Sequence, residues 1–249
     1  ALSPCMAACP AGVDIRGNHY LIQQGHLGEA ARRYRSVQPF PAITGRVCFH
    51  PCEKKCARNH VDEAVNINAV EQIMGDWDLK APLEKPARRH ITKVAVIGSG
   101  PAGLSCAWFL AQMGYPVTVF EAMPLPGGML RYGIPAYRLP DAIVAAHIAR
   151  LEAMGIAFRC NTKIGEGADL SLSDLKRLGF KAVMLAPGTT VSRKVRMEGV
   201  ELPGVHWGLE FLRANRGDEQ PRLSGDVLVI GGGDVAVDAA ITAKRLGAA

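Results

Sequence analysis

The sequence predicts an α/β fold, in which an N-terminal all-helical region precedes a parallel sheet of the doubly wound type. Three observations support this class. Residues 10–80 carry apolar residues at helical spacing, a segment rich in proline and arginine follows at residues 82–90, and short apolar strands then alternate with helices. Such alternation is typical of parallel sheets covered on both faces.

The composition is that of a globular protein, since 48% of the 249 residues are hydrophobic and 21% are charged. The most apolar stretch, residues 94–113, is interrupted by three glycines and a proline, so no membrane span is predicted. No signal peptide opens the chain, which favours a cytoplasmic location. The net charge of +6 is spread over short basic groups without interleaved aromatic residues, so nucleic-acid binding is not predicted.

Helices are predicted in the N-terminal region at Ile15–Gln24, Leu27–Arg35 and Val65–Trp77. Gly25 separates the first two, and Pro39 and Pro41 break the helical pattern before a group of cysteines.

Strands and helices alternate after residue 90. The predicted strands are Val94–Ile97, Val117–Phe120, Ile156–Cys160, Ala182–Ala186 and Val227–Ile230. The predicted helices are Pro101–Gly114, Asp141–Met154, a short one near Ser173, and a last one that ends at Ala249.

The first strand and helix are joined by a glycine-rich turn with the spacing Gly98, Gly100, Gly103. The first glycine permits a tight turn, the second lets backbone approach a pyrophosphate, and the third lets the helix pack against the strand. Pro101 opens the helix, whose N-terminus offers free N–H groups to phosphate. Glu121, at the end of the next strand, is placed to accept hydrogen bonds from ribose hydroxyls and would repel a 2′-phosphate, which favours FAD or NAD.

A second glycine group, GGMLRYGIP, follows at residues 127–135. Backbone without side chains approaches a flat ligand closely, but a surface loop explains this segment equally well.

A second dinucleotide turn is predicted from Gly231, Gly233, Asp234 and Ala236. Two such turns in one chain suggest two adenine dinucleotides, as exchange between a nicotinamide and a flavin requires. Asp234 and Asp238 lie in the first turns of the helix, where carboxylates favour the helix dipole, so capping or packing is expected of them. No catalytic acid or base is predicted, because the two rings carry the chemistry.

Five of the seven cysteines lie in the first 56 residues, with the pattern Cys5-x3-Cys9, then Cys48-x3-Cys52-x3-Cys56. Thiolates at such spacing hold zinc or an iron–sulfur cluster. His50 and His60 would support zinc, whereas the flavin site downstream favours iron and sulfur. Cys106 and Cys160 are expected to be small buried apolar residues, and Cys106 lacks the close partner that a disulfide reductase needs.

Seven motifs together carry a resemblance to a known family: PCMAACPAGVDI, FPAITGRVC, HPCEKKC, IGSGPAGL, GGMLRYGIP, LAPGTT and IGGGDVAVD. The chain resembles the small (beta) subunit of NADPH-dependent glutamate synthase. Related proteins are the N-terminal half of dihydropyrimidine dehydrogenase and the large subunit of NADH-dependent ferredoxin:NADP oxidoreductase.

The resemblance implies a helical Fe–S domain at residues 1–85, the first part of an FAD domain at 86–222, and the start of an NAD(P)H domain at 223–249. It assigns Cys9, Cys48, Cys52 and Glu71 to one [4Fe–4S] cluster. Cys5 and Cys56 match ligands of a second cluster whose other cysteines lie upstream in the relatives. Further FAD contacts are implied for Gly128, Met129, Arg138, Ile164 and the turn from Ala186 to Gly188.

The resemblance also implies a function. The chain is expected to belong to an oxidoreductase that passes electrons from NADPH or NADH through FAD and a [4Fe–4S] cluster to a redox partner. That partner would be a protein of the glutamate synthase large-subunit type, a ferredoxin or a fused domain. The segments that complete the NAD(P)H and FAD domains are missing, which predicts a chain about twice as long. Two alternatives stay open: a zinc-stapled nucleotide-binding module without redox activity, and a flavoenzyme acting on a small molecule.

Overall fold

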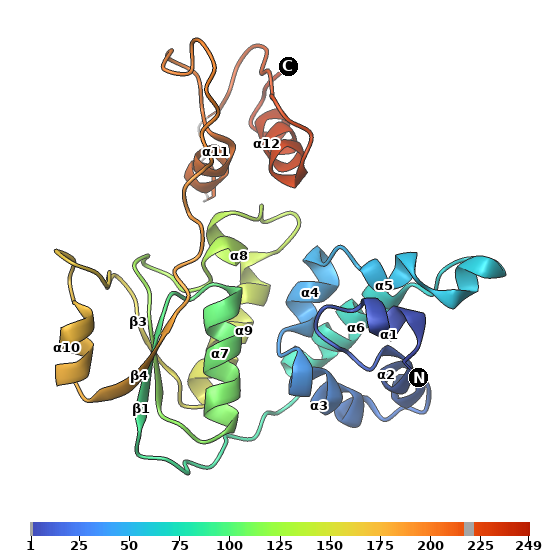
Figure 1. Ribbon diagram of the computed structural model, residues 1–249. Coiled ribbons are helices and arrows are strands. Elements are labelled where there is room, and N and C mark those ends of the chain that lie inside the picture. The colour runs from blue at the N-terminus through green and yellow to red at the C-terminus, as the bar shows by residue number, and fades with distance from the viewer. Residues whose placement is uncertain (1, 217–221) are drawn as a thin grey trace. The chain divides into compact units, whose positions relative to one another are not determined.

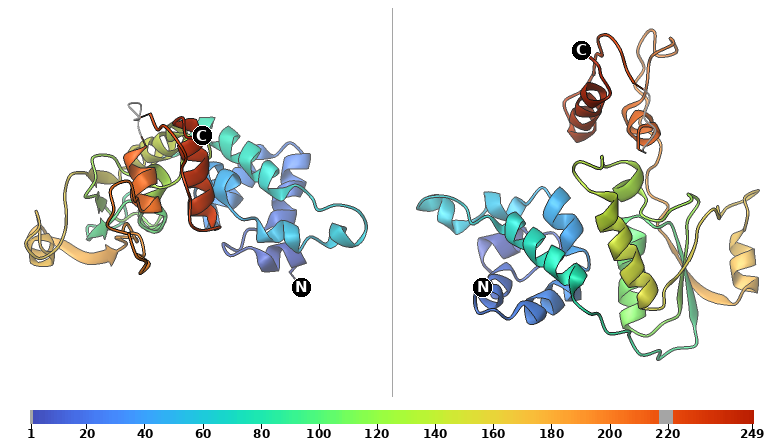
Figure 2. Two further views of the ribbon diagram at one scale, coloured as in Figure 1. Left: turned by 90° about the horizontal axis from the view of Figure 1, so that it is seen from above. Right: turned by 180° about the vertical axis from the view of Figure 1, so that it is seen from behind.

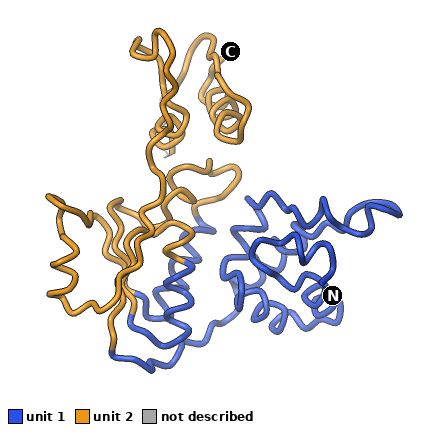
Figure 3. The backbone as a smooth tube through the Cα atoms, viewed as in Figure 1, with its two compact units in different colours: residues 1–91, 105–116, 142–156 blue, residues 92–104, 117–141, 157–249 orange. Residues whose placement is uncertain are grey.

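The computed structural model describes residues 2–216 and 222–249. The chain divides into two compact units (Figure 3). The first comprises residues 1–91, 105–116 and 142–156, and the second comprises residues 92–104, 117–141 and 157–249. No helix among the described residues is long and apolar enough to cross a membrane.

The N-terminal part of the first unit is a cluster of short helices (Figures 1 and 2). They are α1 (Pro4–Ala8), α2 (Ile15–Gln23), α3 (Leu27–Val37), α4 (Pro41–Val47), α5 (Pro51–Lys54) and α6 (Ile67–Lys80), with a 3-10 turn at Ala57–His60. The three predicted helices are therefore confirmed to within a few residues. The Asp14 and Asn66 side chains cap α2 and α6 by accepting hydrogen bonds from backbone N–H groups.

Pro41 ends the preceding helical pattern as expected, but it also begins α4. Proline is favourable at the first helical position because its N–H would be unsatisfied there anyway. Helix α4 packs closely on α6: a Cβ added at Gly75 would lie closer than 3.0 Å to backbone atoms of Ala42.

The second unit contains a four-stranded parallel sheet in the order β3-β2-β1-β4, which confirms the predicted parallel arrangement. The strands are β1 (Lys93–Ile97), β2 (Val117–Phe120), β3 (Ala157–Arg159) and β4 (Phe180–Leu185). The helices that follow β1, β2 and β3 along the chain are α7 (Pro101–Gln112), α8 (Met129–Tyr132), α9 (Asp141–Ala153) and α10 (Leu172–Arg177). Leu175 of α10 packs in one apolar cluster with Ala95, Phe120 and Phe180 of the sheet.

Two helices follow the sheet, α11 (Gly208–Ala214) and α12 (Asp234–Arg245). The strand predicted at Val227–Ile230 is wrong, because the structure has no strand over these residues and leaves Leu228 86% exposed. An apolar run becomes a strand only when a neighbouring strand pairs with its backbone, and the described residues provide none for it. Helix α12 ends at Arg245, before Ala249, where Gly247 takes a left-handed backbone conformation typical of helix ends.

Two cysteines differ from expectation. Cys106 of α7 and Cys160, which follows β3, are only partly buried. The prediction that both cysteines are buried apolar residues is therefore wrong.

Candidate functional site

The first predicted dinucleotide turn connects β1 to α7 and is built around backbone contacts. Gly98 has a φ of +100°, and its N–H donates a hydrogen bond to the carbonyl of Phe120 at 2.8 Å. A Cβ at Gly98 would lie closer than 3.0 Å to the carbonyl oxygen of Ala186, and one at Gly103 would lie equally close to that of Gly98. Both positions therefore require glycine for the turn and for the packing of the helix.

Gly100 differs from its two neighbours in the motif, since a Cβ added there would meet no atom within 4 Å. Across the turn lies Gly128, whose own Cβ would come within 2.7 Å of the Gly100 Cα. The two glycine groups are thus side by side, and α8 begins at Met129 directly after the contact. A surface with open space above Gly100 and no side chains at either glycine fits a pyrophosphate and a flat ring system.

Glu121 is buried at the end of β2, next to the same turn. Its carboxylate accepts hydrogen bonds from the Ser99 N–H at 3.0 Å, from the Ser99 hydroxyl, and from the Met123 N–H at 2.9 Å. The Ser99 hydroxyl also accepts a hydrogen bond from the Gly127 N–H at 2.9 Å. Ser99 therefore joins the predicted ribose-binding carboxylate to the second glycine group, a role that sequence reasoning missed.

Two other parts of the chain are implied to contact FAD: the turn from Ala186 to Gly188, which lies beside Gly98, and Ile164, which packs in an apolar cluster. The turn from Ala186 to Gly188 follows β4, and the Ala186 N–H donates to the carbonyl of Ile97 at 2.8 Å, directly before Gly98. Ile164 forms a parallel bridge with Leu170 and packs against the apolar cluster that contains Phe120.

Arg138 forms an ion pair with Asp238 of α12, with 2.7 Å between Nη1 and Oδ2. The neighbouring Tyr137 hydroxyl donates to Oδ1 of the same aspartate at 3.2 Å, and Arg245 lies 4.0 Å from the centre of the Tyr137 ring. Asp238 is nearly buried and packs as the sequence predicts. Its pairing with Arg138 spans 100 positions of the chain, and no local sequence signal indicates it.

The second dinucleotide turn precedes α12. Gly231 has a φ of +135°, and a Cβ there would lie 3.4 Å from the Cβ of Ala236, whereas Gly232 and Gly233 face open space. Gly233 is the N-cap residue and Asp234 the first residue of α12. The geometry fits an anion at the N-terminus of a twelve-residue helix.

Three cysteines of the first unit lie in or against the core of the helical cluster. Cys52 belongs to the buried core, and Cys5 and Cys9 pack against it. His50 has a left-handed backbone conformation, and its N–H donates to Sγ of Cys48 at 3.3 Å, which turns the chain between Cys48 and Cys52. The cysteines form no disulfide among the described residues.

The thiol of Cys48 lies near Glu71, and Cys9 lies near both Cys48 and Cys52. Burial raises the pKa of Cys48, and the charges of Glu71 and Cys9 raise it further. Burial likewise raises the pKa of Cys52 to about 11, with contributions from Cys9 and Cys48. Burial also raises the pKa of Glu71, whose carboxylate accepts hydrogen bonds from Gln38 Nε2 at 2.9 Å and from the Thr44 hydroxyl.

The chemistry of this donor set fits an iron–sulfur cluster, since cysteine thiolates are the usual ligands of such clusters. Across residues 2–216 and 222–249, no three His, Cys, Asp or Glu side chains stand close enough together to hold a metal ion. Ligation by Cys9, Cys48, Cys52 and Glu71 therefore stays a prediction.

Cys5 and Cys56 line a separate pocket of about 370 Å³, together with His19. The pocket brings together the two residues that the resemblance assigns to a second cluster. Burial lowers the pKa of His19, and its Nε2 has no hydrogen-bond partner in the described structure.

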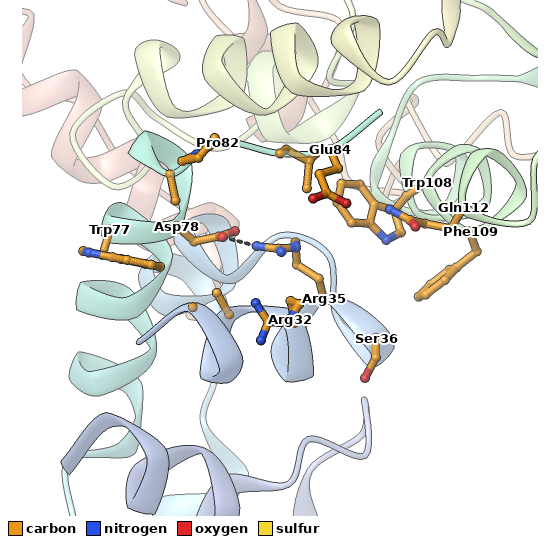
Figure 4. Close-up of a pocket in the computed structure, with 14 residues that line it drawn as sticks. Arg32, Arg35, Ser36, Trp77, Asp78, Pro82, Glu84, Trp108, Phe109 and Gln112 are labelled. Atoms are coloured by element: carbon orange, nitrogen blue, oxygen red, sulfur yellow. Dashed lines mark hydrogen bonds and ion pairs between the residues drawn. The ribbon is translucent and has the colours of Figure 1, made fainter. Parts of the chain in front are cut away.

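A larger pocket, of about 660 Å³, lies between α3, the end of α6 and the C-terminal part of α7 (Figure 4). Its walls include Trp77, Trp108 and the ion pair of Arg35 with Asp78, and Arg150 binds the same carboxylate at 2.9 Å. None of the predicted site residues lines this pocket. We therefore assign it no function.

Comparison with known proteins gives two family matches. The family described as pyridine nucleotide-disulphide oxidoreductase matches residues 92–249, and the one described as dihydropyrimidine dehydrogenase domain II, 4Fe-4S cluster, matches residues 1–82. FAD with a pyridine nucleotide and a [4Fe–4S] cluster, the predicted cofactors, are those that the two families indicate.

Two curated relatives cover nearly the whole chain. The NADPH-Fe(3+) oxidoreductase subunit beta of Geobacter sulfurreducens is 38% identical over 99% of this chain and 37% of its own length. The glutamate synthase [NADPH] small chain of Bacillus subtilis is 39% identical over 95% of this chain and 53% of its own. The chain thus spans about 37% to 53% of these relatives.

A solved structure agrees at the level of the fold. FprA of Mycobacterium tuberculosis in complex with NADPH has a TM-score of 0.51 and 20% identity, over 64% of this chain and 42% of its own. The predicted resemblance and fold class are confirmed. Because the first of these family models matches residues 92–249, more than half of its length, the chain belongs to the pyridine nucleotide-disulphide oxidoreductase family.

Proposed function

We propose that this chain is the electron-entry part of an NAD(P)H-dependent FAD/[4Fe–4S] oxidoreductase that delivers electrons to a partner protein or domain. The observation that carries the proposal is the paired glycine surface, where Gly100 faces open space and Gly128 lies against it. The relatives support it because their names identify them as NADPH-dependent and as a subunit or chain of a larger enzyme.

The residues of the first turn would hold FAD. Gly98, Gly100, Pro101 and Gly103 present the N-terminus of α7 to the pyrophosphate, and Glu121 would accept hydrogen bonds from the ribose. Met129, at the start of α8, and Arg138 lie in the segment that follows Gly128. Bound there, FAD supplies the capacity to accept two electrons from a nicotinamide and to release them singly.

The second turn would hold the nicotinamide dinucleotide through Gly231, Gly233, Asp234 and Ala236, at the N-terminus of α12. The names of the relatives divide between NADPH-dependent and NAD-dependent enzymes, and no residue of this turn decides between the two nucleotides.

In the helical cluster, Cys9, Cys48, Cys52 and Glu71 would ligate one [4Fe–4S] cluster, and Cys5 and Cys56 would contribute to a second. A cluster supplies one-electron transfer, and the protein sets its potential by ligand type, hydrogen bonds and burial. The proposal also includes a cytoplasmic location. It places the boundaries between the iron–sulfur, FAD and NAD(P)H domains near residues 85 and 222.

The test uses the full-length protein that contains this chain, purified under argon. We expect about one equivalent of FAD, iron together with acid-labile sulfide, and bleaching of the flavin absorbance when NADPH or NADH is added. No bleaching with either nucleotide would refute the proposal. Stoichiometric zinc without iron and sulfide would instead identify a zinc-stapled interaction module.

A further inference from the structure

Tyr34 of α3 carries a hydroxyl that the described structure leaves without a hydrogen bond. The residue is 1% exposed, and its oxygen has no partner among the described residues. A buried hydroxyl without a partner costs about 1–3 kcal/mol, so such groups are rare in native proteins. The position therefore calls for an acceptor.

The surroundings of Tyr34 point to the kind of acceptor. Tyr34 and Cys52 belong to one buried core cluster, against which Cys9 packs. Burial raises the pKa of Tyr34, and the charges of Glu71, Cys52 and Cys9 raise it further, so all three lie near the phenol. At neutral pH a phenol keeps its proton and donates a hydrogen bond.

The polar groups that contact the proposed ligands Glu71 and Cys48 already have partners in those contacts. Thr44 and Gln38 hold the carboxylate of Glu71, and the His50 N–H donates to Sγ of Cys48. Tyr34 is thus a buried donor without an acceptor, in the same core as the proposed ligand Cys52 and next to Cys9.

We propose that the Tyr34 hydroxyl donates a hydrogen bond to a sulfur of the [4Fe–4S] cluster at Cys9, Cys48, Cys52 and Glu71, and so raises its reduction potential. The inference rests on the proposed function. Tyr34 is a positioning residue in this role and makes no bond to iron. A donor that faces a sulfur stabilises the more negative, reduced form, which is why hydrogen bonds to sulfur raise the potential.

The test replaces Tyr34 by phenylalanine in the full-length protein and measures the cluster potential by a redox titration followed by electron paramagnetic resonance. We expect the one-electron reduction equilibrium to shift roughly tenfold toward the oxidised form, a fall of about 59 mV. The wild-type cluster in H2O is expected to show a proton coupling that is lost in D2O and that the Tyr34→Phe variant lacks in either solvent.

Tyr115→Phe is the matched control, because its ring stacks on His90 and it does not belong to the cysteine core cluster. This variant is expected to keep the wild-type potential. Wild-type and Tyr34→Phe proteins, both loaded with iron and sulfide, could have equal potentials and equal couplings. That result would overturn this inference but not the proposed function, and a buried water would then be the partner of the hydroxyl. A wild-type protein without iron and sulfide would overturn the proposed function and this inference together.

Discussion

The Ser99 hydroxyl donates a hydrogen bond to the buried carboxylate of Glu121, across the turn that links β1 to α7. The same oxygen accepts the N–H of Gly127, so one side chain ties three segments of the candidate FAD site. Ser99→Ala would leave that N–H unsatisfied and Glu121 less firmly oriented, at a cost of about 1–3 kcal/mol. We expect FAD to bind roughly tenfold more weakly, measured by flavin fluorescence titration of the apoprotein.

Ser36→Ala is the control for this prediction. Ser36 is exposed, and its hydroxyl donates only to the carbonyl of Arg33. Equal FAD affinity in the two variants would show that Ser99 plays no part in orienting the site.

Gly100 and Gly103 are expected to respond differently to alanine. Gly100→Ala places its methyl group in open space, so the melting temperature should stay near the wild-type value while FAD affinity falls sharply. Gly103→Ala brings the methyl group closer than 3.0 Å to the carbonyl of Gly98, so the fold itself should lose stability. Calorimetry and flavin content, measured on both variants, separate the two effects. A Gly100→Ala variant with full flavin content would contradict the proposed pyrophosphate position.

The sequence predicted the sheet well because the signals of its elements are local. Strand Val117–Phe120 and the Gly98–Gly103 turn follow from short apolar runs and glycine spacing, and both lie where predicted. Helices α4, α8 and α11 were missed because they are short and depend on packing. The strand at Val227–Ile230 was wrong because apolar residues do not form a strand without a pairing partner.

The candidate site was predictable where a motif marks it and unpredictable where a contact spans the chain. Glycine and cysteine spacing indicated the loops and thiols. The bonds of Ser99 with Glu121, and of Arg138 with Asp238, join residues 22 and 100 positions apart, so no periodicity reveals them. Tyr34 reads as an apolar helix position until the structure shows its hydroxyl buried without a partner.

Asp78 is expected to be a major determinant of stability in the first unit. Its carboxylate is completely buried and binds both Arg35 and Arg150. Asp78→Ala would leave two guanidinium groups uncompensated, so we expect a loss of about 3–5 kcal/mol in the free energy of unfolding, measured with urea. Asp62→Ala removes an exposed partner of Arg58 and is expected to change nothing measurable. Equal losses in both variants would refute the special role of Asp78.

His147 of α9 should make the first unit sensitive to acid. Burial lowers its pKa to about 3 from 6.5, and the charges of Arg150 and Arg46 contribute. Between these values the unfolded chain binds a proton that the folded chain does not, so stability falls as pH falls from about 6.5 toward 3. The slope is at most about 1.4 kcal/mol per pH unit. Urea unfolding at several pH values should show that the free energy of unfolding of His147→Leu falls less steeply below pH 6.5 than that of the wild type. An equal fall in both proteins would contradict this account.

Asp238 is expected to hold α12 through its two partners, Arg138 and Tyr137. Both of its carboxylate oxygens are used, and the residue is nearly buried, so losing the charge removes an ion pair that is largely shielded from solvent. Asp238→Asn keeps the shape but not the charge. We expect faster hydrogen exchange at the amides of α12, because opening of this helix no longer breaks a charge-assisted bond.

Asp234→Asn is the matched control, since it removes a carboxylate from the same helix at its exposed first residue. It should leave exchange in the middle of α12 unchanged, because the helix dipole favours a carboxylate only within the first turn. Faster exchange in both variants would mean that helix charge, and not the bond to Arg138, stabilises α12. Unchanged exchange in Asp238→Asn would mean that packing alone holds the helix, because the shape of the side chain is preserved in that variant.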